Sequence, residues 1–365
     1  MKIAQVAPLY ESCPPKLYGG TERVVSYLTE ALVRAGHEVT LFASGDSETS
    51  AELHAVCPQA LRLIDGYDSS LAFHVVQMNR VMAQADDFDV IHFHTDFLHF
   101  PFFNLDRPAR TVTTLHGRLD LLELPLVFGE FPHKAVVSIS DDQRRPLPWL
   151  NWRSTVYHGL PVENFTIGAG SGGYLAFLGR ICPDKRPDRA IDIARRVGLP
   201  LKIAAKVDKA DTVYFEEVIR PLLRDPLIEY IGEIGEAEKS RFLGNARALL
   251  FPIDWPEPFG LTMIEAMGCG TPVIAYRHGS VPEIVEDGVT GFIVGGEQEA
   301  ADRMDAALSL DRDRVRARFE QRFSVERMMR DYLNVYMALA EETSLVMHPL
   351  AIASPSKSLP TVRAA

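Results

Sequence analysis

Short apolar runs alternate with longer segments of helical periodicity through almost the whole chain, and no other feature limits the fold as strongly. Segments 3–7 and 38–43 consist mainly of apolar and β-branched residues. Segment 21–35, between them, spaces its apolar residues as an amphipathic helix does. Strands and helices that alternate in this way build parallel sheets covered by helices. The sequence therefore predicts an α/β fold.

The same two patterns recur along the rest of the chain. Gly36 follows the first predicted helix, at a place where a residue free to adopt a positive φ is favoured. We predict further strands at 90–93, 111–115, 135–139, 154–157, 174–178, 201–205, 228–230 and 248–252, and further helices at 187–197, 299–308 and 324–340. Since the second half repeats the architecture of the first, we expect two doubly wound parallel sheets.

The length and one glycine-rich segment predict the domain organisation. A chain of 365 residues is too long for one ordinary core and suits two domains of about 150 to 180 residues. Segment 168–173 is almost all Gly, Ala and Ser, which is typical of a linker. We therefore predict domains at 1–167 and 168–323, followed by a helix at 324–345. The tail 346–365 is rich in Pro, Ser and Ala, and we expect it to be disordered.

Charge and composition argue against several classes of protein. The formal net charge of -11 argues against a nucleic-acid binder, because such binding depends on clustered Lys and Arg. The four cysteines are widely scattered, which indicates reduced thiols and a cytoplasmic protein. The first apolar run is too short for a secretory signal, and no window approaches the roughly 20 apolar residues of a membrane span. Any membrane contact would be peripheral.

The segment around Glu257 carries the strongest chemical signal. Pro256 and Pro258 should hold Glu257 in an extended loop, because proline restricts both itself and the residue before it. Gly260 begins a short helix, and the free amides of a first helical turn form a natural anion site. Glu265 lies about one turn into that helix, so both carboxylates could address one ligand. The alternative is that Glu257 caps the helix and Glu265 lies on a solvated face.

Two further elements could bind phosphate. Arg180 and Lys185 lie in a loop that follows one predicted strand and precedes a helix, from which both could reach a diphosphate. Ordinary surface charge remains the alternative for each of them. Gly19 and Gly20 follow the first strand and would let the backbone approach a ligand closely, although a plain tight turn is equally consistent. The full G-x-G-x-x-G fingerprint is missing, so a nicotinamide cofactor is not supported.

His116 ends the predicted strand 111–115, where open α/β sheets place their ligand groups. A structural role is the alternative for any single histidine. Three other patterns have structural interpretations: the D-x-D strings at 87–89 and 311–313 as solvated acids, and the apolar run 97–103 as core packing rather than an acceptor pocket or lipid contact. His92, His94, Asp96 and His99 complete no zinc ligand set of known spacing, so we predict no metal site.

In this order and spacing, the motifs resemble the retaining GT-B glycosyltransferases of family four, also called glycosyl transferases group 1. The resemblance covers residues 1 to about 340. Within the family, it is nearest to the branch with sugar transferases of avilamycin-type antibiotic clusters. It implies two Rossmann-like domains facing a cleft and a C-terminal helix that crosses back to the first domain. The motifs lie at 18–22, 36–39, 115–117, 179–185, 257–272 and 279–292.

The resemblance also implies roles. Glu257 would hold hydroxyls of a donor sugar, Arg180 and Lys185 its diphosphate, and Glu265 its ribose. The remaining positions would complete the donor site: amides of Phe259, Gly260, Leu261 and Thr262 in the cradle, Gly19 and Gly20 closing on the phosphates, and His116 in the sugar pocket. The catalytic set would be Glu257, His116, Arg180 and Lys185. Segment 157–161 departs from the family pattern, and we assign that departure to the interdomain hinge.

The expected function is metal-independent transfer of a hexose-type sugar, with retention, from a nucleotide diphosphate sugar to a hydroxyl acceptor. The acceptor would be a small molecule, a glycan or a lipid-linked molecule, and no cofactor is expected. The alternatives are a sugar phosphorylase or nucleotide-sugar epimerase on the same fold, and a non-catalytic nucleotide-sugar sensor.

Overall fold

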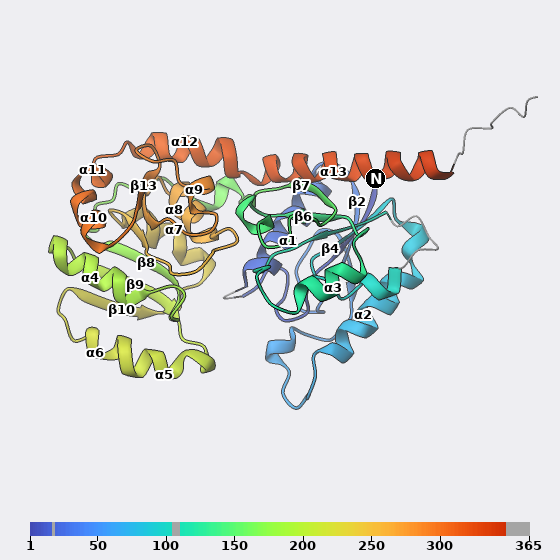
Figure 1. Ribbon diagram of the computed structural model, residues 1–365, viewed down its shortest axis with the longest axis horizontal. Coiled ribbons are helices and arrows are strands. Elements are labelled where there is room, and N and C mark those ends of the chain that lie inside the picture. The colour runs from blue at the N-terminus through green and yellow to red at the C-terminus, as the bar shows by residue number, and fades with distance from the viewer. Residues whose placement is uncertain (17–18, 104–109, 348–365) are drawn as a thin grey trace, which may run out of the picture.

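The computed structural model describes residues 1–16, 19–103 and 110–347 and contains two parallel sheets, one in each half of the chain (Figure 1). The first sheet has seven strands in the order β3-β2-β1-β4-β5-β6-β7, and the second has six in the order β10-β9-β8-β11-β12-β13. All strand pairs are parallel. The predicted α/β class with two doubly wound sheets is confirmed.

The bounds of the strands follow. The first sheet consists of β1 (Lys2–Val6), β2 (Glu38–Ala43), β3 (Glu52–Ala55), β4 (Val90–Phe93), β5 (Thr111–Thr114), β6 (Val136–Ser138) and β7 (Trp152–Thr155). The second consists of β8 (Leu175–Arg180), β9 (Leu201–Lys206), β10 (Ile228–Gly232), β11 (Leu249–Phe251), β12 (Val273–Tyr276) and β13 (Gly291–Val294).

The helices cover both faces of each sheet. In the first half of the chain they are α1 (Gly20–Arg34), α2 (Leu71–Ala83) and α3 (Leu124–Glu130). In the second half they are α4 (Pro187–Val197), α5 (Thr212–Tyr214), α6 (Arg220–Leu222), α7 (Glu236–Asn245), α8 (Leu261–Gly268), α9 (Val281–Ile284), α10 (Glu297–Asp302), α11 (Met304–Leu308), α12 (Arg312–Phe323) and α13 (Val325–Met347). None of these helices, within the described ranges, has the length and apolar character that crossing a membrane requires.

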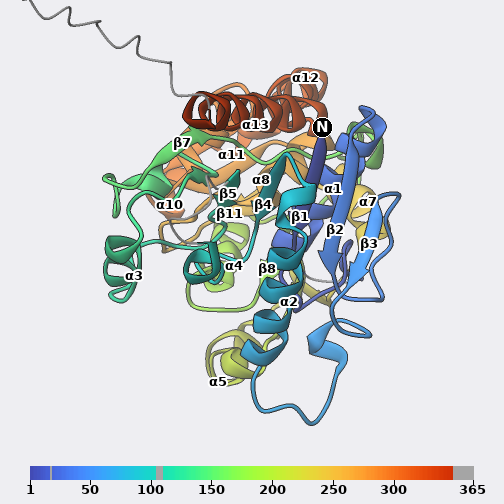
Figure 2. The ribbon, with the colours of Figure 1, turned by 90° about the vertical axis from the view of Figure 1, so that its right-hand side faces the viewer.

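Helix α13 returns from the second domain and packs on the first sheet, along the top of Figure 1 and Figure 2. Its residues Tyr332 and Tyr336 are fully buried in one core with Leu28 of α1 and Ile3 of β1. The neighbouring strand residue Ala4 faces the other core, beneath α2. Alternate strand side chains point to opposite faces, so α1 and α13 cover one face of this sheet and α2 covers the other.

Most predicted elements occur with shifts of one or two residues, and a few differ more. Strand β7 lies two residues earlier than predicted, because it is partly exposed and no apolar run marks it. Helix α13 differs more, since it continues to Met347, beyond the predicted helix 324–340. The helix predicted at 299–308 is interrupted at Arg303 and forms α10 and α11. Ten of the helices and strands named above were not predicted: β3, β12, β13, α2, α3, α5, α6, α7, α9 and α12.

The predicted domain boundary at residue 168 falls in the connection between β7 and β8. Residues 346 and 347, predicted as tail, belong to α13. The disorder predicted for the rest of that tail concerns residues 348–365, which lie outside the described residues. These domain limits stay predictions.

Candidate active site

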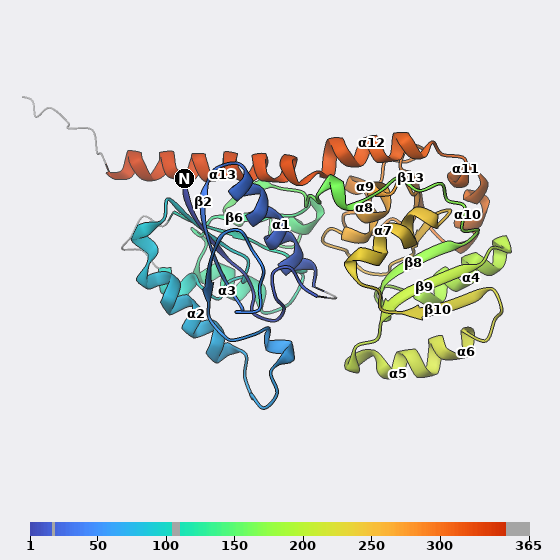
Figure 3. The ribbon, with the colours of Figure 1, turned by 180° about the vertical axis from the view of Figure 1, so that it is seen from behind.

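A cavity of about 480 Å³ lies between the two domains and brings together every site residue predicted from the sequence. Figure 3, seen from behind, shows α1 of the first domain and α7 and α8 of the second on the two sides of this region. The predicted residues that line the cavity are Gly19, Gly20, His116, Arg180, Lys185, Glu257, Phe259, Gly260, Leu261, Thr262 and Glu265. Residue 18, quoted with the first glycine motif, lies outside the described residues.

The loop between β11 and α8 places Glu257 in the cavity wall. Glu257 is only 8% exposed, and its carbonyl accepts a 2.9 Å hydrogen bond from the Ser280 amide. Gly279 lies against this loop so closely that a Cβ there would come within 2.3 Å of the Glu257 backbone nitrogen and oxygen. Gly260 adopts a left-handed φ of 84° directly before α8, which glycine permits. The loop conformation is therefore fixed on both sides of Glu257.

Two donors meet one oxygen of the Glu257 carboxylate. The Lys185 ammonium forms an ion pair with Oε2, and the indole Nε1 of Trp255 donates to the same oxygen at 2.9 Å. Arg180, at the end of β8, forms ion pairs with Asp208 at 3.7 Å and Asp211 at 3.5 Å. Lys185 and Arg180, two of the cationic residues that line the cavity, are thus both paired with carboxylates.

Glu265 is almost fully buried on α8, with 1% of its surface exposed. Its Oε1 accepts a 2.6 Å hydrogen bond from Lys239 of α7, whose ammonium also lies 3.1 Å from Glu236. Glu236 is ion-paired with Arg23 of α1 and accepts a 3.1 Å hydrogen bond from Tyr27 of the same helix. This network joins the predicted ribose carboxylate to the first domain.

The first-domain wall of the cavity approaches α8 directly. An added Cβ on Gly20 would lie 3.5 Å from the Leu261 Cδ1 atom, and one on Gly19 would lie 2.7 Å from Pro15 Cβ. The start of α1 therefore lies within van der Waals distance of the start of α8, and Gly19 is the position where a side chain would collide, with Pro15. Leu261 and Thr262 occupy the first turn of α8, where helical amides lack partners within the helix, so the anion site expected there faces the other domain.

His116 lines the cavity as a neutral imidazole, because burial lowers its pKa from the ordinary 6.5 to about 3. Its Nε2 lies 2.9 Å from Nδ1 of His94, and its ring stacks on His158 with 5.3 Å between the centroids. His158 also meets the Phe259 ring edge-on at 4.8 Å. His158 belongs to segment 157–161, which follows β7 and which we assigned to the interdomain hinge. Its side chain also lines the cavity.

The lining residues that sequence reasoning did not select include Arg23, His158, Lys239 and Trp255. Arg23 follows the Gly-Gly-Thr-Glu motif and could have been found from it. Lys239 lies in a charged helix with no distinguishing pattern, and its role depends on which face of α7 meets α8.

The histidines considered as zinc ligands belong to the core. His92 lies 2.7 Å from both the Tyr336 hydroxyl and the Thr114 hydroxyl, and His99 stacks on Phe93 with a centroid distance of 3.7 Å. Within the described residues, no group of three or more potential ligands could hold a metal ion. In the D-x-D strings, Asp89 accepts from the Lys2 amide, and Asp311 caps α12.

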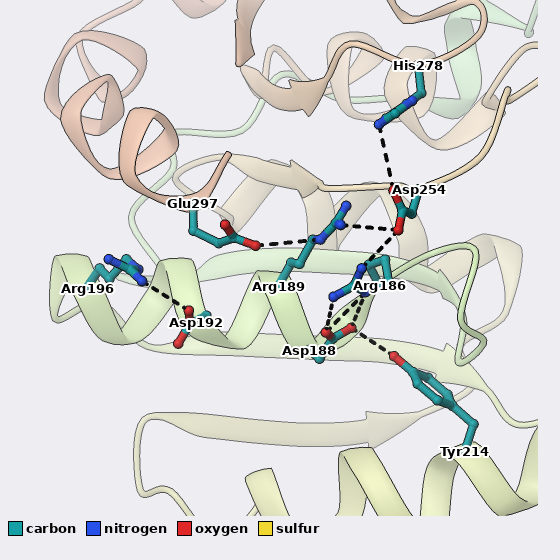
Figure 4. Close-up of polar contacts among 9 residues, drawn as sticks. All are labelled: Arg186, Asp188, Arg189, Asp192, Arg196, Tyr214, Asp254, His278 and Glu297. Carbon is teal, nitrogen blue, oxygen red and sulfur yellow. Dashed lines mark hydrogen bonds and ion pairs between the residues drawn. The ribbon is translucent and has the colours of Figure 1, made fainter. Parts of the chain in front are cut away.

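Asp254 forms ion pairs with Arg186 and Arg189 (Figure 4) and so connects the segment after Lys185 with the segment before Glu257. Its Oδ2 accepts from Arg186 at 3.0 Å and from Arg189 at 3.2 Å, and its amide donates to the Asp184 carbonyl at 2.9 Å. Arg186 holds an uncommon left-handed φ of 50°. Asp188 and Asp254 together fix that side chain. These ion pairs therefore hold the loops of Lys185 and Glu257 in place through residues that do not themselves line the cavity.

Asp254→Asn should lower the free energy of unfolding by about 1 kcal/mol, since its ion pairs are half exposed and screened by solvent. It should also raise the Michaelis constant for the donor, because both cavity loops lose a brace. Urea denaturation and steady-state kinetics measure the two effects. Asp192→Asn is the matched control: Asp192 pairs with Arg196 at 3.4 Å on the outer part of α4 and should change neither. Equal effects of the two substitutions would contradict this account.

Comparisons with known proteins agree with this architecture. The family model Glycosyltransferase Family 4 matches residues 18–158, and the model Glycosyl transferases group 1 matches residues 169–322. O-antigen chain mannosyltransferase C of Escherichia coli is 25% identical over 379 residues, covering 93% of this chain and 100% of that protein. D-inositol 3-phosphate glycosyltransferase of Mycobacterium bovis is 29% identical over 215 residues, covering 57% of this chain and 40% of that protein.

Similar solved structures share the fold. AviGT4, a glycosyltransferase involved in avilamycin A biosynthesis, matches with a TM-score of 0.71 and 24% identity, covering 93% of this chain and 98% of that one. Sucrose-phosphate synthase from Thermosynechococcus elongatus matches with a TM-score of 0.76 and 18% identity, covering 93% and 99%. Together with the two family models and the motifs in the cavity, these relationships identify the chain as an enzyme: it belongs to the GT-B glycosyltransferases of family 4.

Proposed function

We propose that the enzyme transfers a hexose-type sugar, with retention, from a nucleotide diphosphate sugar to a hydroxyl acceptor, without a metal ion. The observation that carries this proposal is the convergence of Lys185, Arg180, the start of α8 and two carboxylates in one interdomain cavity. Each group is suited to one part of such a donor.

The cationic side of the cavity is suited to a diphosphate. Arg180 ends β8, Lys185 lies in the segment that links β8 to α4, and the first turn of α8 lines the same cavity. Helix N-termini and basic side chains stabilise anions, and this stabilisation grows where water is excluded. These groups would stabilise the negative charge that develops on the leaving diphosphate. In many other phosphate sites a metal ion stabilises that charge.

The two carboxylates are suited to hydroxyl groups. Glu265 has one oxygen, Oε2, that is buried without a hydrogen-bond partner among the described residues, and a ribose hydroxyl would satisfy it. Glu257 would accept from hydroxyls of the sugar. Because Glu257 is already held by Lys185 and Trp255, we assign it to binding rather than to attack on the anomeric carbon. A donor phosphate oxygen would accept the acceptor's proton.

The acceptor class is proposed from the names of similar proteins, and the cellular setting from the cysteines. The names of similar proteins mention an O-antigen chain, inositol 3-phosphate and a lipopolysaccharide outer core, so we propose a small-molecule, glycan or lipid-linked acceptor. The four cysteines are buried and free, which supports our placement of the enzyme in the reducing cytoplasm.

A thermal-shift screen against nucleotide diphosphate sugars tests the donor class, because a ligand that binds only the folded state raises the melting temperature. At about one hundred times its dissociation constant, the true donor should add about 2.7 kcal/mol of stability. If no nucleotide sugar raises the melting temperature, the proposal fails.

Product analysis with inorganic phosphate as acceptor separates sugar transfer from phosphorolysis. NMR of the product shows whether the anomeric configuration is retained.

Removal of divalent cations tests the metal-free mechanism. With excess chelator, the transfer rate should stay within about twofold of its value in magnesium, because Lys185 and Arg180 already supply positive charge at the proposed phosphate site. A rate that falls at least tenfold and recovers when magnesium is added would contradict this part of the proposal.

A further inference from the structure

Trp255 precedes Glu257 by two residues and lines the same cavity. Its indole Nε1 donates to Oε2 of Glu257 at 2.9 Å, and the Lys185 ammonium is paired with that same oxygen. One carboxylate oxygen therefore receives a neutral donor and a cationic donor, whereas Oε1 remains for another partner.

The ring of Trp255 also contacts the cation itself. The Lys185 Nζ atom lies 5.0 Å from the Trp255 ring centroid and 5.6 Å from that of Phe251. From the first domain, the Arg118 guanidinium lies 5.9 Å from the same indole, and Asp120 holds that guanidinium through bonds of 2.6 and 2.7 Å. Attraction between cations and an aromatic face stabilises this arrangement, so Lys185 has a defined place when the diphosphate is absent.

A bound diphosphate would change the partner of Lys185. Its two negative charges compete with the single charge of Glu257 for the ammonium. Glu257 is 8% exposed, and a nearly buried carboxylate that loses its cation must keep another donor or lose most of its stabilisation. The Trp255 indole is such a donor, and it carries no charge that a phosphate could draw away.

We propose that Trp255 is a positioning residue of the donor site, which holds the Glu257 carboxylate in place for the sugar while Lys185 turns to the diphosphate. This inference rests on the proposed function. It separates two parts of donor recognition: Lys185 binds the diphosphate, and Trp255 acts on the sugar through Glu257.

Trp255→Phe removes the N–H and keeps an aromatic ring. Isothermal titration calorimetry is done with UDP and UDP-glucose and with GDP and GDP-mannose. For the pair that binds, affinity for the nucleotide sugar should fall about tenfold, and affinity for the nucleoside diphosphate should change less than about threefold. Trp149→Phe, at a half-exposed tryptophan outside the cavity, should change neither affinity.

A double-mutant cycle with Glu257→Ala, which removes the acceptor of the Trp255 N–H, shows whether Trp255 acts through Glu257. In the Glu257→Ala background, Trp255→Phe should have almost no further effect on nucleotide-sugar affinity, since the two residues form one unit. Equal losses for the sugar-bearing and sugar-free ligands, no loss, or full additivity in the cycle would each overturn the inference. If the wild-type protein binds none of the nucleotide sugars of the thermal-shift screen, the proposed function fails first and this inference fails with it.

Discussion

Lys185→Ala should lower the transfer rate by about 10³-fold, the largest effect of any single substitution that we expect. The ammonium is the cation nearest Glu257, and in the proposed mechanism it stabilises charge that develops on the leaving diphosphate. Water cannot replace it fully, because the Lys185 side chain is only 17% exposed and its charge acts in a partly desolvated place. The measurement is the steady-state rate with the donor that the thermal-shift screen identifies.

The matched control for this prediction is Lys202→Ala. Lys202 forms an ion pair with Glu229 at 2.9 Å on neighbouring strands, away from the cavity. Lys202→Ala should leave the transfer rate within about twofold of the wild-type value, since exposed ion pairs contribute little to stability. Lys185→Ala also leaves Glu257 without its cation, so its folding must be verified by thermal denaturation. A folded Lys185→Ala variant with nearly normal activity would contradict the site assignment.

Glu257→Gln should lower kcat/KM by about 10²-fold while the chain stays folded. The amide keeps the size of the side chain but offers only one carbonyl oxygen, and the Trp255 N–H and the sugar hydroxyls then compete for it. The same substitution removes the negative charge that holds Lys185, so nucleoside diphosphate affinity should be kept or should rise. Loss of sugar recognition with intact diphosphate binding distinguishes this result from misfolding.

Glu229→Gln is the control here, because Glu229 is the partner of Lys202 in the ion pair used above. It should leave both affinities and the rate unchanged. If Glu257→Gln keeps normal kcat/KM, Glu257 does not contact the donor and the proposed sugar pocket must lie elsewhere in the cavity.

Much of the fold could be predicted from the sequence, because buried parallel strands are continuous apolar runs. The predicted bounds of β2, β4 and α4 agree with the structure, and Gly36 has the expected positive φ of 86°. Exposed elements gave weaker signals: β3 is only partly buried, and α2 leaves several apolar side chains in solvent. The apolar runs at β12 and β13 were available in the sequence but were not assigned.

In the candidate site, too, some residues could be found from the sequence and others only from the folded structure. Glu257, Gly260 and Arg180 could be selected because prolines, glycines and strand ends restrict the local backbone, and local restrictions are visible in sequence. His158, Trp255 and Lys239 were not selected. Their importance comes from what they touch: His116 and Phe259 for His158, the Glu257 carboxylate for Trp255, and Glu265 for Lys239.

By itself, the sequence determined the α/β class, the two sheets, the helix that begins after Gly260 and the group of residues suited to a sugar and a diphosphate. Only the tertiary structure decided which charges are paired. Lys185 is held by Glu257 and an indole, Glu265 is joined through Lys239 and Glu236 to Arg23, and Asp254 braces two loops. The physical reason is that backbone preference acts over a few neighbouring residues, whereas an ion pair or a buried hydrogen bond depends on distances between segments that the chain brings together only on folding.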